Sequence, residues 1–274
     1  MLRAFGDFII AIHLAVKNKS HHPIHFIASK HFEPLFNELN LTVPPNFSIQ
    51  FFEFNIRHNI MGCLTDRYLF SFSTIKELIT LKTFMINYPI PGQYFLEHKK
   101  RSALLSAFCG YQFKHIIDKQ NVYQGYANFF AASLDDLENI PFNLKQSKLK
   151  VLLIPNARQQ KREISTSIIS IINNSSKQMG FELSLGSFGD QIIQLSSAIE
   201  SLTYRNFNEL IQLILQFDLI IGSDSMPIHL AQLLKKPHYI LYPKYIEKQF
   251  FTPFALKHNT YFTFEEIIDK QSFF

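Results

Sequence analysis

The chain is poor in the residues that build disulfide-rich or metal-knuckle proteins. Its 274 residues include two cysteines, Cys63 and Cys109, and no tryptophan. Two cysteines exclude a disulfide framework and a paired Cys-x-x-Cys metal knuckle, and they leave room for one disulfide at most. We therefore expect a fold that is stabilised by its hydrophobic core. The low cysteine count also fits a protein of a reducing compartment.

Long apolar runs are also missing. No segment reaches the roughly 18–20 apolar residues that a membrane-spanning helix needs. The apolar stretch Phe8 to Val16 is flanked by Asp7 and interrupted by His13, and no small-residue cleavage site follows it, so it is a poor signal peptide. We expect a cytoplasmic protein, either free or peripheral to a membrane.

Charge of one sign is not in large excess. The chain has 27 Lys and Arg against 22 Asp and Glu, a formal net charge of +5. This mild excess permits attraction to a phosphorylated ligand or an anionic surface, but it lacks the dense basic character of nucleic-acid-binding proteins. Hydrophobic residues make up 47% of the chain, enough for a substantial core.

The second half alternates between strand and helix patterns. Apolar runs at 150–154, 181–185, 219–223 and 239–243 predict buried strands. Isoleucines at helical spacing predict a helix from Ile164 that ends at Gly180, and Asn206 with Glu209 predicts a capped helix start. A further helix is expected from Pro227 to Lys236. This alternation predicts an α/β fold with a doubly wound parallel sheet.

The first half has weaker patterns of the same kind. We expect helices at 8–16, 32–39 and 74–84, and strands at 24–28 and 47–54. The segment Asn139 to Lys150 contains Pro141 and several lysines, which is typical of a linker. The sequence therefore predicts two domains, residues 1–140 and 150–274.

Asp224 and Ser225 form a polar turn between the strand 219–223 and the next helix, and His229 follows one helical turn later. Ligands of open α/β sheets bind beyond the carboxyl ends of strands, and a helix N-terminus attracts anions. Ser225 could cap the helix, with Pro227 in its first turn. Without other information, a purely structural capping role for the two polar residues is the more common reading.

Two other loops contain residues that could bind a phosphorylated ligand or act in catalysis. The loop 155–162 follows a strand and contains Arg158, Lys161 and Arg162, which suits a diphosphate, although solvated basic loops are common. The pair Gly6-Asp7 precedes an apolar helix pattern. Its carboxylate could act as a general base or could simply cap the helix.

The segment Asp224 to Ala231 resembles the donor-sugar motif of glycosyltransferase family 9, the heptosyltransferase-like enzymes. Asp, Ser, Pro, an apolar residue, His, Leu and Ala match that motif in order, and Met226 stands where the family has glycine. The helix end, Lys236-Pro237 and the strand that follows are similar to the family as well, with Tyr242 in place of a glycine.

The other two loops are similar to family signatures. The run from Pro155 to Arg162 looks like the family's Pro-Gly-Ala-Arg signature, in which Arg158 and Lys161 match the basic positions. This implies that Lys161 contacts phosphate. Gly6-Asp7 matches the family's Gly-Asp pair, which implies Asp7 as the general base. Gly186 and Asp190 match a nucleotide-contacting turn only loosely.

The resemblance implies a GT-B architecture of two Rossmann-like domains, the first binding the acceptor and the second the donor, with the site between them. It implies an inverting transfer that needs no metal and no cofactor. The sugar would come from a nucleotide-diphosphate donor, ADP-heptose being the best-known one. The acceptor would be a lipopolysaccharide or lipooligosaccharide core or another surface glycan.

Two alternatives share this fold. The first is a nucleotide-sugar hydrolase or epimerase. The second is a catalytically degenerate homologue that binds a sugar nucleotide. Two features of the sequence are the reason to consider this alternative. Met226 replaces a glycine, and only five residues precede Gly6 where the family has a whole strand. That strand is shortened, begins upstream of this sequence, or belongs to an acceptor half that has degenerated.

Three other groups of residues are interpreted as structural or solvent-exposed features. The spacing of His21, His22, His25 and His31 fits no standard zinc site. The basic run 97–101 is read as a solvated face that would face an anionic acceptor if it has a function, and Tyr123 to Tyr126 as a turn with packed aromatic rings.

Overall fold

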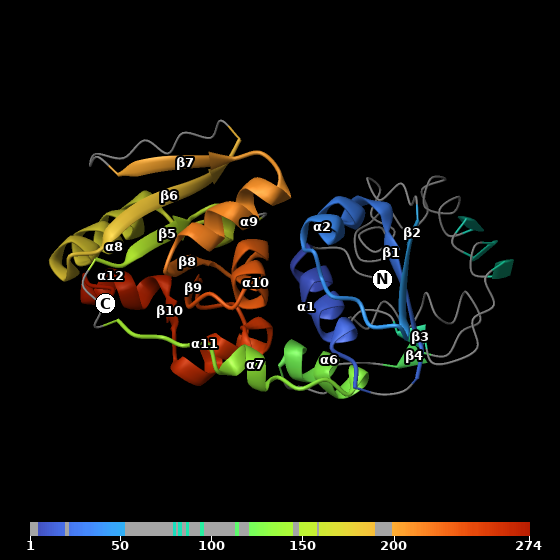
Figure 1. The fold of residues 1–274 in the computed structure, drawn as a ribbon. Helices are drawn as coiled ribbons and strands as arrows, with labels where there is room; N and C mark the ends of the chain where they lie inside the picture. The colour runs from blue at the N-terminus through green and yellow to red at the C-terminus, as the bar shows by residue number, and fades with distance from the viewer. Residues whose placement is uncertain are drawn as a thin grey trace.

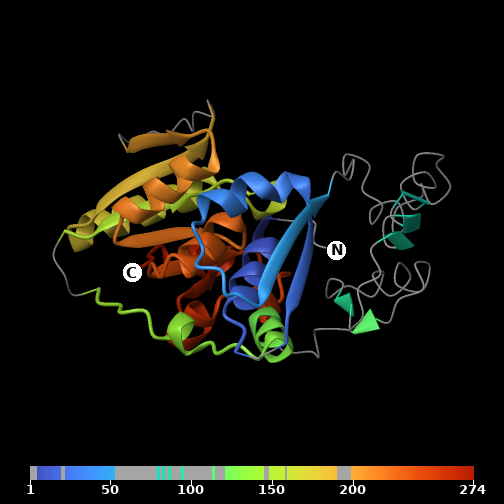
Figure 2. The same ribbon diagram turned by 45° about the vertical axis from the view of Figure 1, so that its right-hand side comes forward.

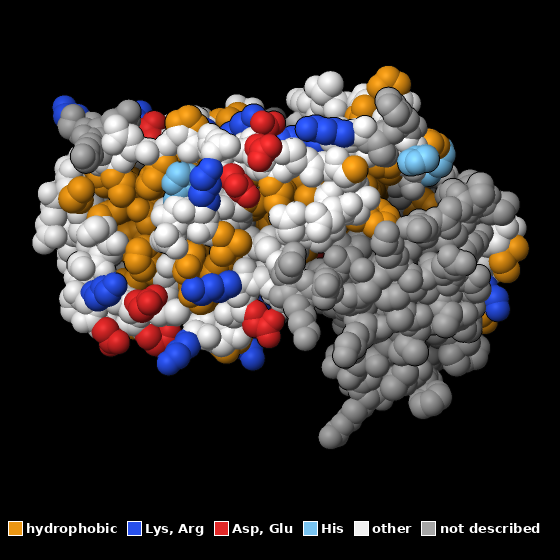
Figure 3. All heavy atoms as spheres, turned by 90° about the horizontal axis from the view of Figure 1, so that it is seen from below, with side chains coloured by type: hydrophobic (Ala, Val, Ile, Leu, Met, Phe, Trp, Pro, Cys, Tyr) orange, Lys and Arg blue, Asp and Glu red, His pale blue; other side chains and the backbone are white. Residues whose placement is uncertain are grey.

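The protein folds into two lobes in the computed structural model (Figure 1). The structure describes residues 5–19, 22–52, 121–144, 148–157, 159–189 and 199–274, together with short helical or strand pieces between 79 and 114. Within this described part, no helix is long and apolar enough to cross a membrane. On the face shown in Figure 3, the described Lys and Arg side chains are interspersed with Asp and Glu.

The C-terminal lobe is built on a six-stranded sheet in which every pairing is parallel. Its strands lie in the order β10-β9-β8-β5-β6-β7. Numbered along the chain, this is the strand order 6-5-4-1-2-3 of the doubly wound Rossmann fold. The predicted parallel α/β sheet is confirmed. The strands are β5 (Lys150–Ile154), β6 (Glu182–Phe188), β7 (Glu200–Tyr204), β8 (Leu219–Ser223), β9 (His238–Tyr242) and β10 (Tyr261–Thr263).

Helices cover both faces of this sheet. The predicted helix before Gly180 is α8 (Thr166–Met179), capped by Ser165 and closed by Gly180 at φ 72°. Asn206 caps α9 (Phe207–Gln216) by accepting a hydrogen bond from the Glu209 N–H, as predicted. The remaining elements are α10 (Met226–Leu233), α11 (Pro253–His258), α12 (Phe264–Lys270) and the short 3₁₀ helices η2 (Gln160–Arg162) and η3 (Lys248–Phe250).

The N-terminal lobe contains the predicted helix at its start, longer by one turn, as α1 (Phe5–Val16). The predicted strands pair in parallel as β1 (Ile24–Ser29) and β2 (Phe47–Phe52). Between them lie η1 (Lys30–Phe32) and α2 (Glu33–Glu38). Of the predicted helix 74–84, the structure describes residues 79, 80, 82 and 83, and these four are helical. Further elements are β3 (Tyr94–Phe95), β4 (Phe113–Lys114), α6 (Val122–Phe130) and α7 (Asp135–Glu138).

Helix α1 is buried on nearly every side. Gly6 and all residues from Phe8 to Ala15 are buried, and α1 packs against both α10 and α6. In both views of the ribbon, α1 lies between α10 and the β1–β2 pair (Figures 1 and 2). A helix that is apolar all round has to find partners on all sides. Here one side of α1 belongs to the C-terminal lobe.

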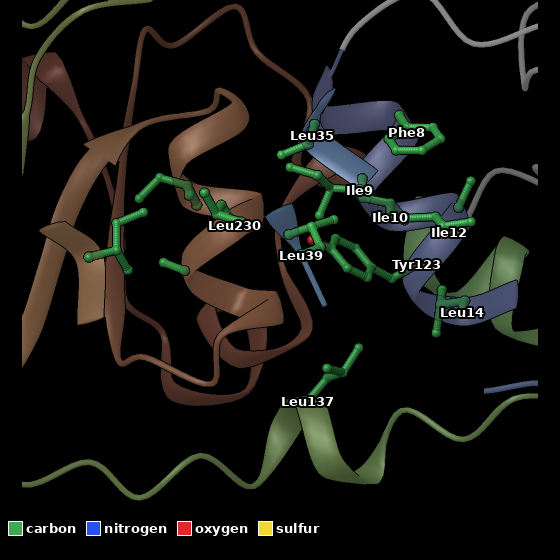
Figure 4. Packing of buried hydrophobic residues seen from close by; sticks show 14 of the residues in the cluster. Phe8, Ile9, Ile10, Ile12, Leu14, Leu35, Leu39, Tyr123, Leu137 and Leu230 are labelled. Atoms are coloured by element: carbon green, nitrogen blue, oxygen red, sulfur yellow. The ribbon is translucent and has the colours of Figure 1, made fainter. Parts of the chain in front are cut away.

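The two lobes therefore share one hydrophobic core. It runs from Phe8, Ile10 and Leu14 of α1 to Ile228 and Leu230 of α10 without a break. Figure 4 shows the α1 side chains together with Leu35, Leu39, Tyr123, Leu137 and Leu230. A second core lies on the opposite face of the six-stranded sheet, under α8 and α12. The N-terminal lobe thus packs on the helical layer of α9 and α10.

Buried hydrogen bonds fix the segment around α6 and α7 to the C-terminal lobe. Gln232 of α10 donates to the Leu137 carbonyl at 2.8 Å and accepts from the Phe254 N–H at 3.0 Å. Asn121, which caps α6, donates to the Phe251 carbonyl at 2.7 Å. The chain then enters β5 through the predicted linker.

Candidate functional site

The candidate site lies where the strand order of the C-terminal sheet reverses. That reversal occurs between β5 and β8, which are neighbours, with Ile154 beside Gly222 near their carboxyl ends. The loop 155–162 leaves β5 and the Asp224 turn leaves β8, so the two predicted donor loops emerge side by side. Crevices at such reversal points are where doubly wound sheets bind nucleotides.

Asp224 is the centre of the polar network at this edge. It is only 6% exposed. The Arg162 Nη1 atom donates to the Asp224 Oδ2 atom at 3.2 Å and to its carbonyl oxygen at 3.3 Å. The carboxylate is therefore neutralised by a cation from the neighbouring loop, as a buried charge requires. This ion pair joins the two loops.

His229 lies one turn into α10 and contacts groups from both lobes. Its Nε2 atom is 3.6 Å from the Asp224 Oδ1 atom, and its Nδ1 atom is 2.9 Å from the Tyr123 hydroxyl. His229 is 6% exposed and Tyr123 is 2% exposed. A chain of polar groups therefore runs from the partly exposed Arg162 through the buried Asp224 and His229 to the buried Tyr123 of α6.

Gly6 brings the first predicted motif to the same place. A Cβ atom at Gly6 would lie 2.7 Å from the Cδ2 atom of His229, closer than real side chains approach. The glycine backbone therefore lies directly on the imidazole ring, which only glycine permits. Asp7, half-buried in the first turn of α1, is the next residue. Two motifs more than 200 residues apart thus meet.

Ser225 occupies the N-cap position of α10 but its side chain does not cap the helix. Its Oγ atom donates to the Ser223 carbonyl at 3.1 Å instead, so the predicted capping hydrogen bond is wrong. Met226, in the first turn, is half-buried and packs against the shared core. Pro227 has no N–H, and the Ile228 N–H donates to the Ser225 carbonyl at 3.1 Å, so an oxyanion at this helix start would meet the Met226 N–H and the positive end of the helix dipole.

Lys161 and Arg162 are consecutive but have different partners. Lys161 is exposed, and its Nζ atom lies 5.7 Å from the centre of the Tyr245 ring, which belongs to the loop after β9. The geometry leaves Lys161 free to turn toward a ligand, since an exposed cation–π contact is worth about 0.5–1 kcal/mol. Arg158, the other predicted phosphate ligand, lies outside the described residues.

Gly186 is not in a turn, so that part of the prediction is wrong. Strand β6 continues through it to Phe188, and the turn comes at Gly189, with φ 63°. A Cβ atom at Gly186 would lie 3.2–3.5 Å from side chains of Ile154, Leu152 and Leu213, so this glycine allows close packing of the sheet. Asp190, its predicted companion, lies outside the described residues.

Two residues of the network were missed by the sequence interpretation. Tyr123 was placed in a turn, but Val122–Phe130 is helix α6. Asn121 before it and buried residues at helical spacing, Val122, Tyr126, Ala127 and Phe130, were the available signal. Arg162 was treated as part of a basic loop, and nothing in the sequence distinguished it from Arg158 or Lys161.

The predicted histidine cluster has ordinary partners where it is described. His25 contacts the Ser48 hydroxyl at 2.7 Å, and His31 contacts the Ser29 hydroxyl at 2.9 Å. Among the described residues there is no group of three or more His, Cys, Asp or Glu side chains that could hold a metal ion.

Comparison with known proteins gives similarity in structure only. No protein-family model and no curated protein matches the chain. A glycosyl transferase of family 9 from Veillonella parvula is similar, with TM-score 0.61 and 13% identity, over 100% of this chain and 88% of that one. E. coli heptosyltransferase WaaC, solved with ADP, has TM-score 0.54 and 11% identity, over 98% of both chains.

E. coli ADP-heptose lipopolysaccharide heptosyltransferase II is a third similar structure, with TM-score 0.50 and 13% identity, over 94% of this chain and 86% of that one. These likenesses extend over both lobes and agree with the Rossmann strand order of the C-terminal sheet. The chain therefore has the α/β, GT-B-like fold of the family 9 glycosyltransferases, as the sequence resemblance predicted.

Proposed function

We propose that the protein is an inverting glycosyltransferase that takes a sugar from a nucleotide-diphosphate donor. The observation that carries this proposal is the meeting of Gly6-Asp7, Asp224 and His229 at the reversal point of the sheet. The fold supports the same reaction class. Since similar E. coli structures contain ADP and an ADP-linked fluoro-heptose, an ADP-linked heptose-like sugar is the first donor to test.

The donor half of the site suits a diphosphate. Lys161 and Arg158 would bind phosphate oxygens, and the positive end of the α10 dipole would add partial positive charge. Asp224, Ser225 and His229 would contact the sugar and its phosphate link. On the nucleotide side, the weaker candidate Asp190, which follows Gly189 in the sequence, would contribute.

The chemistry would centre on Asp7. Its carboxylate would take the proton from an acceptor hydroxyl while that oxygen attacks the anomeric carbon. The bond from the anomeric carbon to the diphosphate would break, and its electron pair would leave with the diphosphate. Positioned cations and amides stabilise that leaving charge, so the step needs neither a metal ion nor a cofactor.

The acceptor would be a lipopolysaccharide or lipooligosaccharide core or another surface glycan. An acceptor with a lipid anchor would bring the protein to the inner face of the inner membrane. The formal charge of +5 favours approach to such an anionic surface.

One observation favours a second candidate, a homologue that binds a sugar nucleotide without transferring the sugar. Gly6 lies so close to His229 that no sugar fits between them in this arrangement. Transfer at that point requires α1 and α10 to separate, whereas nucleotide binding at the outer loops does not.

A thermal-shift series with ADP, GDP and UDP tests the donor site. A nucleotide at 100 times its Kd should stabilise the folded protein by about 2.7 kcal/mol. Lys161→Ala should weaken that binding, and Lys257→Ala, an exposed lysine of α11, is the matched control. The absence of a shift with every nucleotide would contradict the donor site.

A radiolabelled ADP-heptose assay separates the two candidates. Label that reaches a truncated lipopolysaccharide core supports the transferase, and label released as free sugar identifies the hydrolase. Binding with neither outcome identifies the non-catalytic homologue. Asp7→Asn should abolish transfer and leave ADP affinity unchanged. If it transfers sugar at the wild-type rate, the assignment of the base is wrong.

A further inference from the structure

Tyr123 belongs to the polar chain of the site but has no part in the proposed reaction. It lies in α6, and its hydroxyl contacts the Nδ1 side of the His229 ring, whereas Asp224 faces the Nε2 side. At 2% exposure it is shielded from solvent. A buried hydroxyl can hydrogen-bond either tautomer of a buried imidazole, so the tautomer of His229 depends on Tyr123 together with the group that faces the other ring nitrogen.

The direction of this hydrogen bond depends on the group that faces the other ring nitrogen. Burial, together with the nearby Asp224 carboxylate, raises the pKa of Tyr123 well above its ordinary value. The hydroxyl therefore keeps its proton, and it can donate to an unprotonated Nδ1 atom or accept from an Nδ1–H. When it donates to Nδ1 of a neutral imidazole, the ring proton sits on Nε2.

That tautomer is the one that suits Asp224. The Nε2 atom faces the Asp224 Oδ1 atom at 3.6 Å, and an ionised carboxylate only accepts hydrogen bonds. In the opposite tautomer a lone pair on Nε2 would face the carboxylate, which is repulsive. Gly6 restrains the same ring at its Cδ2 edge, so two groups from the N-terminal lobe hold the imidazole.

We propose that Tyr123 is a positioning residue of the donor site, which fixes His229 in the Nε2–H tautomer and orients it on Asp224. The proposal rests on the proposed function for its consequence, namely that the Asp224 turn is ready to bind a donor only while α6 is docked on α10. The N-terminal lobe, which was expected to bind the acceptor, would then also take part in binding the donor, through Tyr123.

The direct test is NMR of the ring nitrogens in protein labelled with ¹⁵N-histidine. His229→Gln assigns the His229 signals by their loss. We expect the wild-type ring to show a protonated Nε2 and an unprotonated Nδ1, and Tyr123→Phe to lose this preference for one tautomer. An Nδ1–H tautomer or an imidazolium in the wild type, or an unchanged ring in Tyr123→Phe, would overturn the proposal.

Tyr126→Phe is the matched control, because it removes another buried hydroxyl from the same helix and keeps the bond to His229. It should leave the His229 signals unchanged. If Tyr123→Phe does not fold, the wild-type tautomer alone still decides the direction of the hydrogen bond.

Affinity for ADP tests the consequence. We expect Kd to rise roughly 3- to 10-fold in Tyr123→Phe, the loss of one buried hydrogen bond, and to change less than about twofold in Tyr126→Phe. Equal affinity in the wild type and Tyr123→Phe would overturn the role in positioning. If ADP binds none of the proteins, the proposed function fails, and the tautomer result stands independently of it.

Discussion

The two lobes bury their helices in different ways. In the C-terminal lobe α8 and α9 each turn one apolar face to the sheet and a polar face to solvent. In the N-terminal lobe α1 has almost no exposed face, and α10 of the other lobe covers part of it. The helices of the C-terminal lobe are therefore buried against the sheet of the same lobe. The N-terminal lobe, in contrast, needs α10 of the other lobe to cover α1.

The candidate site follows the same division. Arg162, Asp224 and His229 come from the C-terminal lobe and form an ordered network by themselves. Gly6 and Tyr123 come from the N-terminal lobe and hold the outer side of His229. Substitutions on the two sides should therefore have different consequences for stability and for binding.

The largest expected effect comes from breaking the shared core. Phe8 of α1 is fully buried and stacks on Phe32 with ring centroids 4.5 Å apart. Phe8→Ala should lower the free energy of unfolding by about 3–5 kcal/mol, because it removes a large side chain and leaves a cavity. Urea unfolding followed by circular dichroism measures this loss.

The cooperativity of the urea transition tests whether the two lobes unfold together. Since one core spans both lobes, we expect a single transition in the wild type. Phe188→Ala is the control, because that side chain is 55% exposed and its loss should change stability by about 0.5 kcal/mol or less. Two separate transitions in the wild type would show that the lobes fold independently.

The next effect comes from the ion pair within the C-terminal lobe. Arg162→Met keeps much of the side-chain volume but leaves the Asp224 carboxylate buried without its cation. Removing one partner of a buried pair costs about 3–5 kcal/mol, and the Arg162 side chain is 28% exposed, so about 2–3 kcal/mol is expected.

The same urea titration checks this value. Asp224→Asn combined with Arg162→Met should recover part of the loss, because the uncompensated charge is then gone. A single Arg162→Met variant as stable as the wild type would mean that Asp224 does not depend on that cation.

A pH-dependent effect of about 2 kcal/mol is expected at the junction of the lobes. Burial, with smaller contributions from Lys17 and Lys235, lowers the pKa of His13 to about 3. The folded state thus keeps His13 neutral while the unfolded state takes up a proton below pH 6.5, so stability falls as the pH falls from 6.5 toward 3. At pH 5 the loss attributable to His13 is about 2 kcal/mol.

His13→Leu should remove this share of the pH dependence, measured as the difference in unfolding free energy between pH 7 and pH 5. His238 of the C-terminal lobe, whose burial lowers its pKa to about 4, should continue to contribute. His25→Gln, at an exposed position, is the control. An unchanged pH profile in His13→Leu would contradict the burial of a neutral His13.

The smallest effect concerns the contact between Gly6 and His229. Gly6→Ala should cost about 1–2 kcal/mol, because the new methyl group overlaps the imidazole ring. In a His229→Ala background the same change should cost nothing or should stabilise the helix, since alanine is the better helix former. Thermal unfolding of the four proteins completes this double-mutant cycle, and additive effects would contradict the contact.

The regular lobe was the predictable one. Isoleucines at helical spacing and Gly180 predict helix α8, and continuous apolar runs predict the strands β5, β8 and β9. Strand β7 was missed because it is an edge strand whose residues are mostly exposed and polar. Helix α6 was missed because Gly125 suggests a turn, although a glycine within a helix costs only about 0.5–1 kcal/mol.

Sequence reasoning singled out Asp224 and His229, which the structure brings together after the end of a strand, and Lys161, whose phosphate contact stays a prediction. It placed Asp7 by its motif alone. It could not find Tyr123, because a tyrosine within a run of aromatic residues is indistinguishable from core until the lobes are docked. Nor could it choose Arg162 among the basic residues of its loop, since the turn of η2 determines which side chain reaches Asp224.

The core that α1 and α10 share sets a limit on recombination. A gene fusion that joined the half after Lys150 to the first half of a relative would place a foreign first helix against α10. Its glycine and apolar side chains would have to fit Ile228, His229 and Leu230 of this chain. A successful chimera would therefore have to carry α1 and α6 along with the C-terminal lobe, so the unit of exchange is larger than the Rossmann domain.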